Sequence, residues 1–217
     1  MPVTLSEVVD DLLLRQTQDS GRLNLLATYC IEAFGRLGLQ GVRGGKADEV
    51  GIRGLGRQKD WDLAYVLAGK PRLLVSLKSI LRNLSGTVPN RLDDLMGEAA
   101  NVQQLSPEIV IGDVVIMDEA HDSVRRDGKG TWSDHFESNL RRIAIRRAPL
   151  WNQGLIEGAW LIRIDSRKPH GAANCQHHRY GCQRYKLFSG VARRALSPRT
   201  DVAASPVGCL AGGAVKP

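Results

Sequence analysis

Alternating strand-like and helix-like segments constrain this chain more than any other feature. Apolar runs of strand length and β-branched character occupy residues 61–67, 72–79, 108–118 and 154–165. Segments with helical spacing of apolar residues occupy 5–37 (broken near Gly21), 90 to about 104, and 134–148. The order helices, strand pair, helix, strand, helix, strand predicts an α/β fold, with a mixed central β-sheet flanked by helices.

Three connecting segments complete this prediction. Residues 41–56 are rich in glycine and basic side chains, so we expect a mobile loop or a poorly packed hairpin there. Residues 68–71 (Ala-Gly-Lys-Pro) suit a hairpin turn between the first two strands. Residues 80–89 contain Gly86 and Pro89 and are predicted to be irregular, with Asn90 capping the helix that follows.

The positive charge of the chain is concentrated at its C-terminal end. The formal net charge is +7, and residues 169–217 hold seven basic residues against one acid, Asp201, which leaves +1 for residues 1–168. We therefore divide the chain into a core, 1–168, and a basic tail, 169–217, expected to be disordered or atypical. Within the core, helices at 5–37 precede a sheet-and-helix region at 57–165.

Three of the four cysteines lie in this tail, so a disulfide scaffold in the core is not expected. Cys175, His177, His178 and Cys182 have the chemistry of zinc ligands, but their spacing matches no common zinc pattern. No apolar stretch approaches the roughly 20 residues of a membrane span, and the N-terminus does not resemble a secretion signal. These features predict a cytoplasmic protein without a membrane partner.

Asp62, Ser76 and Lys78 carry the pattern with the clearest chemical meaning. Side chains alternate along a strand, so Ser76 and Lys78 share one face, and pairing of the two strands brings Asp62 close to them. An acid and a lysine at the ends of apolar strands are costly to bury without a purpose. Phosphodiester hydrolysis offers one: a carboxylate holds Mg²⁺, and a lysine orients water and offsets charge in the transition state.

This arrangement resembles the PD-(D/E)xK nucleases, which include many type II restriction endonucleases. Their pattern is an acid on one strand and (D/E)-x-K on the next, here Asp62 followed by Ser76-Leu77-Lys78. Ser76 replaces the second acid. Some restriction enzymes of this fold also carry S-x-K and recruit an acid from the following helix, where this chain has Asn-Arg-Leu-Asp-Asp at 90–94.

A longer stretch is similar to the XhoI-type restriction enzymes. Lys78-Ser79 is followed, after ten residues, by an Asn-Arg-x-acid-acid-x-x-Gly-x-Ala pattern at 90–99. The likeness covers about residues 58–105. It implies a restriction-endonuclease-like core, Mg²⁺ as cofactor, double-stranded DNA as substrate, and a homodimer that cuts both strands.

Several further residues are site candidates. Asp62 and one of Asp93 or Asp94 are the expected metal ligands, Asp93 first, with Glu98 in reserve and Glu32 as an extra ligand. On the 134–148 helix, Arg141, Arg142, Arg146 and Arg147 are candidates for phosphate contacts, although a solvated helix face is the ordinary explanation. The expected DNA contacts are Arg82, Arg91, Arg141 and Arg142.

The predicted function is therefore a Mg²⁺-dependent endonuclease of DNA, of the type II restriction class. Two alternatives remain open. One is a DNA repair or recombination nuclease of the same fold, which would recognise structure instead of sequence. The other is a non-catalytic DNA-binding relative, in which Ser76 marks the loss of metal binding.

Overall fold

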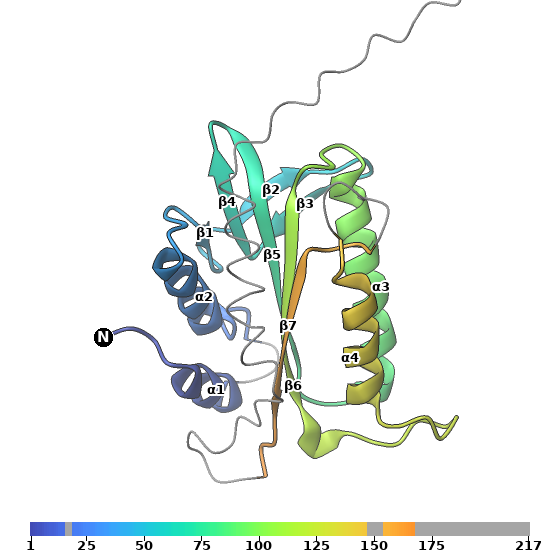
Figure 1. The fold of residues 1–217 in the computed structure, drawn as a ribbon. Coiled ribbons are helices and arrows are strands. Elements are labelled where there is room, and N and C mark those ends of the chain that lie inside the picture. Colours follow the sequence, from blue (N-terminus) through green and yellow to red (C-terminus); the bar gives the residue numbers. More distant parts are fainter. Residues whose placement is uncertain (16–18, 147–153, 168–217) are drawn as a thin grey trace, which may run out of the picture.

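The computed structural model describes residues 1–15, 19–146 and 154–167 (Figure 1). The helices are α1 (Leu5–Leu14), α2 (Asn24–Arg36), α3 (Leu84–Gln103) and α4 (Trp132–Ile143), with a short 3₁₀ turn, η1 (Glu119–His121). The strands are β1 (Arg43–Gly44), β2 (Val50–Arg53), β3 (Gln58–Trp61), β4 (Leu63–Leu67), β5 (Lys70–Ile80), β6 (Val110–Asp118) and β7 (Gly158–Ile164). The tail at 169–217, with its candidate zinc ligands, lies outside the described residues.

A mixed five-stranded sheet forms the centre, in the order β1-β4-β5-β6-β7. The β1–β4 and β4–β5 pairs are antiparallel, whereas β5–β6 and β6–β7 are parallel. Parallel neighbours need a crossover, and α3 and α4 supply the two crossovers. The predicted α/β class with a mixed sheet between helices is confirmed.

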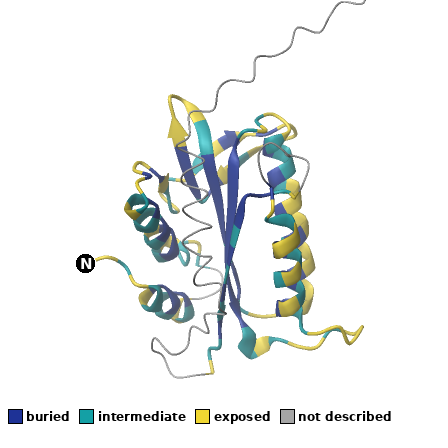
Figure 2. Ribbon diagram, viewed as in Figure 1, coloured by how far each residue is buried: buried dark blue, intermediate teal, exposed yellow. Residues whose placement is uncertain are grey.

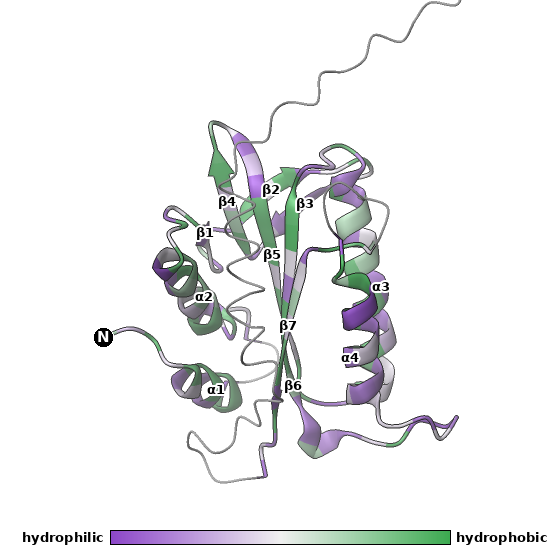
Figure 3. Cartoon of the chain, viewed as in Figure 1, coloured by the Kyte–Doolittle hydropathy of each residue, from purple (hydrophilic) through white to green (hydrophobic). Residues whose placement is uncertain are grey.

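Helices cover both faces of the sheet (Figure 1). The α1–α2 pair packs on one face through a cluster that includes Leu12, Phe34 and Leu77. The α3–α4 pair packs on the other through a cluster that includes Val88 and Val115. Figure 2 shows the strands mostly buried and the outer helix faces exposed, and Figure 3 shows the same division in hydropathy. None of the described helices has the length and apolar character needed to cross a bilayer.

The first strand pair forms as predicted, with a tighter turn. Ala68 and Gly69 both have positive φ (49° and 75°), as in the two-residue turns whose twist matches that of antiparallel strands. Lys70 and Pro71 therefore belong to β5 and not to the turn. The register shifts at Tyr65/Val66, opposite Pro71, which has no N–H to contribute to the ladder.

The predicted start of the third helix is wrong. Residues 84–89 are helical, so α3 begins six residues before Asn90, and Pro89 lies inside it. Burial explains the difference: Leu84 and Val88 are both buried in the α3–α4 core cluster, which outweighs the local preferences of Gly86 and Pro89. Asn83, and not Asn90, occupies the N-cap position.

Residues 41–56 hold more structure than a mobile loop. They contain β1 and β2, and β2 forms a hairpin with β3. Asn101 of α3 holds the hairpin turn, since its Oδ1 accepts the Gly56 N–H (2.8 Å) and its Nδ2 donates to the Arg57 carbonyl (2.9 Å). Long-range hydrogen bonds therefore order a segment whose composition favours flexibility.

Candidate active site

Asp62 occupies the single-residue junction between β3 and β4. Its carboxylate Oδ2 accepts the backbone N–H of Leu77 at 2.8 Å, and its carbonyl accepts the N–H of Gly45 at 3.0 Å. The β4–β5 ladder begins at Leu63↔Val75, so the Asp62 side chain replaces the next backbone acceptor for β5. The register of the strand pair thereby fixes the carboxylate against β5.

Lys78 lies on β5 beside this carboxylate, as the sequence pattern predicts. Its Nζ is 4.0 Å from Asp62 Oδ2, and the two side chains are 25% and 26% exposed. Strand alternation places Lys78 and Ser76 on the α3–α4 face of the sheet, opposite to Leu77. The acid and the lysine therefore meet at a partly open edge, where a solvent-borne ligand has access.

A second ion pair joins Lys59 of β3 to Glu98 of α3, and each side chain is 13% exposed. The Lys59 ammonium also lies over the Trp61 ring, 4.7 Å from its centre. Burial lowers the pKa of Lys59, and the hydrogen bond with Glu98 acts in the opposite direction. Charges of Lys78 and Asp62 also act on Lys59, so the two ion pairs belong to one electrostatic group.

Asp113 is the member of this group that the sequence reasoning missed. It lies on β6 directly beside Ser76 in the parallel register, and it is 4% exposed. Burial raises the pKa of its carboxyl to about 7; the charges of Lys78 and Lys59 lower it, and those of Glu98 and Asp62 raise it further. The available signal was an acid in the middle of the apolar run 109–117.

Two polar groups at this position lack hydrogen-bond partners within the part of the chain that the structure describes. The Ser76 hydroxyl is buried without a partner. No described residue donates a hydrogen bond to the Asp113 carboxyl. Buried polar groups are nearly always satisfied, so the Ser76 hydroxyl and the neighbouring Asp113 carboxyl are candidates for contact with an external ligand.

The other predicted metal ligands lie apart from this group. Asp93 and Asp94 line a separate surface depression of about 390 Å³ near Arg91, and Asp94 pairs with Arg91 at 3.1 Å. Glu32 lies on α2, in the helical layer on the opposite face, and its carboxylate accepts the Val3 N–H at 3.0 Å. Of the acids considered from sequence, the structure brings Asp62 and Glu98 together.

The arginines that were considered for DNA contacts differ in exposure. Arg82, just after β5, is exposed, as are Arg141 and Arg142 on α4, and Arg91 is partly buried. Arg146 is buried, because α4 ends at Ile143 and the chain turns inward. Its guanidinium pairs with Glu157 at 2.7 Å, so a phosphate contact for Arg146 is wrong. Arg147 lies outside the described residues.

The donor set suits a hard divalent cation held with few protein ligands. Asp62, Glu98 and Asp113 offer carboxylate oxygens, which Mg²⁺ prefers. Across 1–15, 19–146 and 154–167, however, no three His, Cys, Asp or Glu side chains converge into a ready-made metal site. Mg²⁺ commonly keeps several waters and takes only one or two carboxylates together with substrate phosphates, a mode that this arrangement permits.

No protein-family model matches the chain, and no curated protein matches it in sequence.

Proposed function

We propose that this chain is a divalent-metal-dependent endonuclease that hydrolyses DNA phosphodiester bonds. The observation that carries the proposal is the pairing of Asp62 with Lys78 at a partly open strand edge, beside the buried carboxyl of Asp113. Acids and a lysine gathered at one point match what phosphodiester hydrolysis requires: anionic ligands for a metal, and a cation for the charge of the transition state.

The fold agrees with this proposal at the level of architecture. The acid immediately precedes β4 and the lysine lies on β5, its antiparallel partner, and parallel strands β6 and β7 follow through helical crossovers. This is compatible with the restriction-endonuclease-like core that the motif resemblance implies. The S-x-K variant then takes its missing acid from Glu98 of α3 and Asp113 of β6, in place of Asp93.

Each residue has a distinct part in the proposed reaction. Asp62, held by the Leu77 N–H, and Asp113 would hold Mg²⁺ together with waters and the substrate phosphate, and Glu98 of α3 belongs to the same charged group. The bound metal would polarise the phosphate and lower the pKa of an attacking water. Lys78 orients that water and offsets the negative charge that develops on the phosphate oxygens. Lys59 holds Glu98 in place and keeps its charge balanced.

The proposal extends to a type II restriction enzyme, with duplex DNA as substrate and a homodimer as the working unit. One copy offers one such site, so cutting both strands at one place calls for two copies. A repair or recombination nuclease would instead recognise DNA structure. The described residues contain no feature that favours this second function over the first.

The deciding experiment incubates the purified full chain with plasmid DNA and Mg²⁺, with a Lys78→Ala preparation as a matched control for contaminating nucleases. Discrete fragments that require Mg²⁺ and Lys78 support a site-specific endonuclease. Metal-dependent cleavage limited to branched or damaged DNA points to the repair function. DNA binding without cleavage in Mg²⁺ or Mn²⁺ would leave a non-catalytic binding protein and overturn the proposal.

A further inference from the structure

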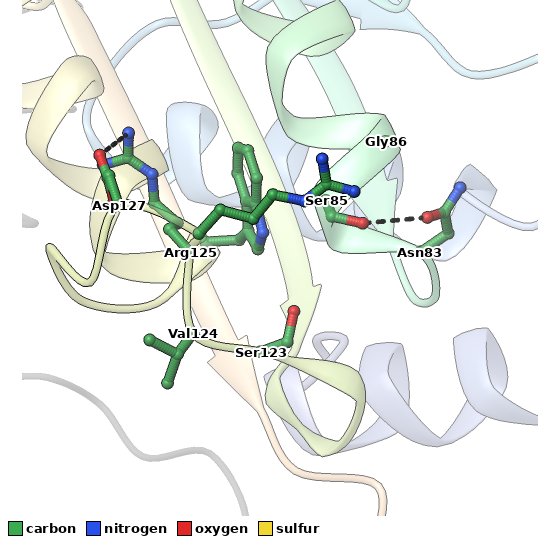
Figure 4. A pocket seen from close by; sticks show the side chains of 9 residues that line it. Asn83, Ser85, Gly86, Ser123, Val124, Arg125 and Asp127 are labelled. Atoms are coloured by element: carbon green, nitrogen blue, oxygen red, sulfur yellow. Dashed lines mark hydrogen bonds and ion pairs between the residues drawn. The ribbon is translucent and has the colours of Figure 1, made fainter.

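A second feature of the molecule is an open pocket of about 630 Å³ between the start of α3 and the segment before α4 (Figure 4). Asn83 and Ser85 line it on one side, and Arg125, Arg126 and Trp132 on the other. It shares no residue with the Asp62–Lys78 site. Its walls are polar and cationic, which suits an anionic ligand.

The wall before α4 is a rigid hairpin and not a loose loop. Val124 and Thr131 form an isolated antiparallel bridge, and the Trp132 N–H donates to the Ser123 carbonyl at 3.2 Å. The Arg125 N–H donates to the Gly130 carbonyl at 3.0 Å. This backbone pairing presents the basic side chains of the hairpin from a fixed position.

The two arginines differ in what holds them. The Arg125 guanidinium lies 5.5 Å from the centre of the Trp132 ring and pairs with Asp127 at 2.8 Å, as the dashed line in Figure 4 marks. These contacts orient it in advance of binding. Arg126 is exposed and has no partner among the residues that the structure describes. Its charge is therefore available to a ligand.

The opposite wall adds backbone donors to the arginine cluster. Asn83 precedes α3 with φ of 50°, and its side chain does not cap the helix. Its Oδ1 instead accepts a long hydrogen bond from the Ser85 hydroxyl, at 3.4 Å (Figure 4). The 20-residue helix α3 therefore has no side-chain cap, and its first turn, at the positive end of the helix dipole, lines the pocket through Ser85 and Gly86.

We propose that this pocket binds the phosphodiester backbone of the DNA that flanks the cleaved bond. The inference rests on the proposed nuclease function and names where the substrate is held. Asn83 follows Lys78 by five residues, so the pocket and the site are joined by at most about 17 Å of extended chain. At about 3.4 Å per base pair, the contact falls within about five base pairs of the scissile phosphate.

The test measures DNA binding separately from cleavage. The full chain in EDTA is titrated with a labelled 20-base-pair duplex at several salt concentrations, and binding is followed by fluorescence anisotropy. Arg125→Ala/Arg126→Ala is compared with Arg15→Ala/Arg36→Ala, which removes the same charge from the α1–α2 layer. A single Arg126→Ala variant is measured as well: this side chain has no hydrogen-bond or ion-pair partner among the described residues, so its loss is not expected to disturb folding.

We expect the double variant to reduce the slope of log affinity against log salt by about 1.8 and the affinity at 0.1 M salt by about ten- to sixty-fold. Arg126→Ala should give about half of this change in slope. The control variant, Arg15→Ala/Arg36→Ala, should change the slope and the affinity little. Equal losses in both double variants, or none in either, would overturn the pocket assignment even if the unmutated chain cuts DNA. In the converse outcome, the chain shows no cleavage while only the pocket variants lose DNA affinity. That result would support DNA binding by the pocket and reject the proposed nuclease activity.

Discussion

The Asp62 carboxylate accepts the backbone N–H of Leu77 at 2.8 Å and lies 4.0 Å from the Lys78 ammonium, so one side chain both completes a strand pair and faces a cation. Substitution can separate the structural role of the Asp62 carboxylate from its chemical role. The side-chain amide of asparagine keeps a hydrogen-bond acceptor but carries no negative charge.

We therefore expect Asp62→Asn to fold normally and to lose cleavage by at least about 10²-fold, as Lys78→Ala does. Asp62→Ala should lose cleavage and also about 1–3 kcal/mol of unfolding free energy, because the Leu77 N–H is left without an acceptor. Urea denaturation and plasmid cleavage of the three variants check this. Near-normal cleavage by either Asp62→Asn or Lys78→Ala would remove both residues from the proposed site.

The second metal ligand is tested by comparing acids on α3. Glu98→Gln should lower the Mg²⁺-dependent rate by about 10²–10³-fold, because Glu98 belongs to the charged group around Asp113. Asp93→Asn and Asp94→Asn should retain activity, since both residues lie in the separate depression near Arg91. Initial rates across a Mg²⁺ titration give the comparison. An inactive Asp93→Asn beside an active Glu98→Gln would restore the ligand that the motif suggested.

The two buried aspartates of β6, Asp113 and Asp118, allow a controlled comparison of their effects on the free energy of unfolding. Asp113 has no described hydrogen-bond donor, whereas Asp118 accepts from Ala120 N (3.0 Å), Ser166 N (3.1 Å) and Ser166 Oγ (2.6 Å). In EDTA at pH 8, Asp113→Asn should raise the unfolding free energy by on the order of 1–3 kcal/mol and Asp118→Asn should lower it. In Mg²⁺, Asp113→Asn should abolish cleavage. If Asp113→Asn is the destabilising variant, the carboxylate has a structural partner and its functional assignment fails.

The buried pair Arg146–Glu157 predicts a purely structural effect. Arg146 Nη1 donates to Glu157 Oε1 at 2.7 Å, and Glu157 Oε2 accepts the Ile111 N–H at 2.8 Å, with both side chains buried. Glu157→Gln should cost about 3–5 kcal/mol of unfolding free energy because it leaves a buried guanidinium uncompensated. Thermal or urea unfolding measures the loss. Arg141→Ala, which breaks an exposed pair with Glu137, should cost under about 1 kcal/mol.

Sequence alone determined the order and type of the main elements. Helical periodicity located α1, α2 and α4, and β-branched apolar runs located β4 to β7, because these patterns express which side of each element is buried. The same local logic placed Asp62 near Lys78. Asp62 immediately precedes β4, Lys78 lies on β5, and a two-residue turn joins these two strands, so only the pairing of neighbours was needed.

Tertiary structure decided what depends on residues distant in the chain. The start of α3 was set by burial of Leu84 and Val88, against the local preferences of Gly86 and Pro89. The packing of α3 against the rest of the fold placed Asp93 in a separate depression and Glu98 against Lys59. Asp113 entered the site through the parallel register of β6 with β5, which no local spacing encodes. Long-range pairing and burial fix these positions, because a strand's register and a helix's buried face are chosen by the partners they pack against.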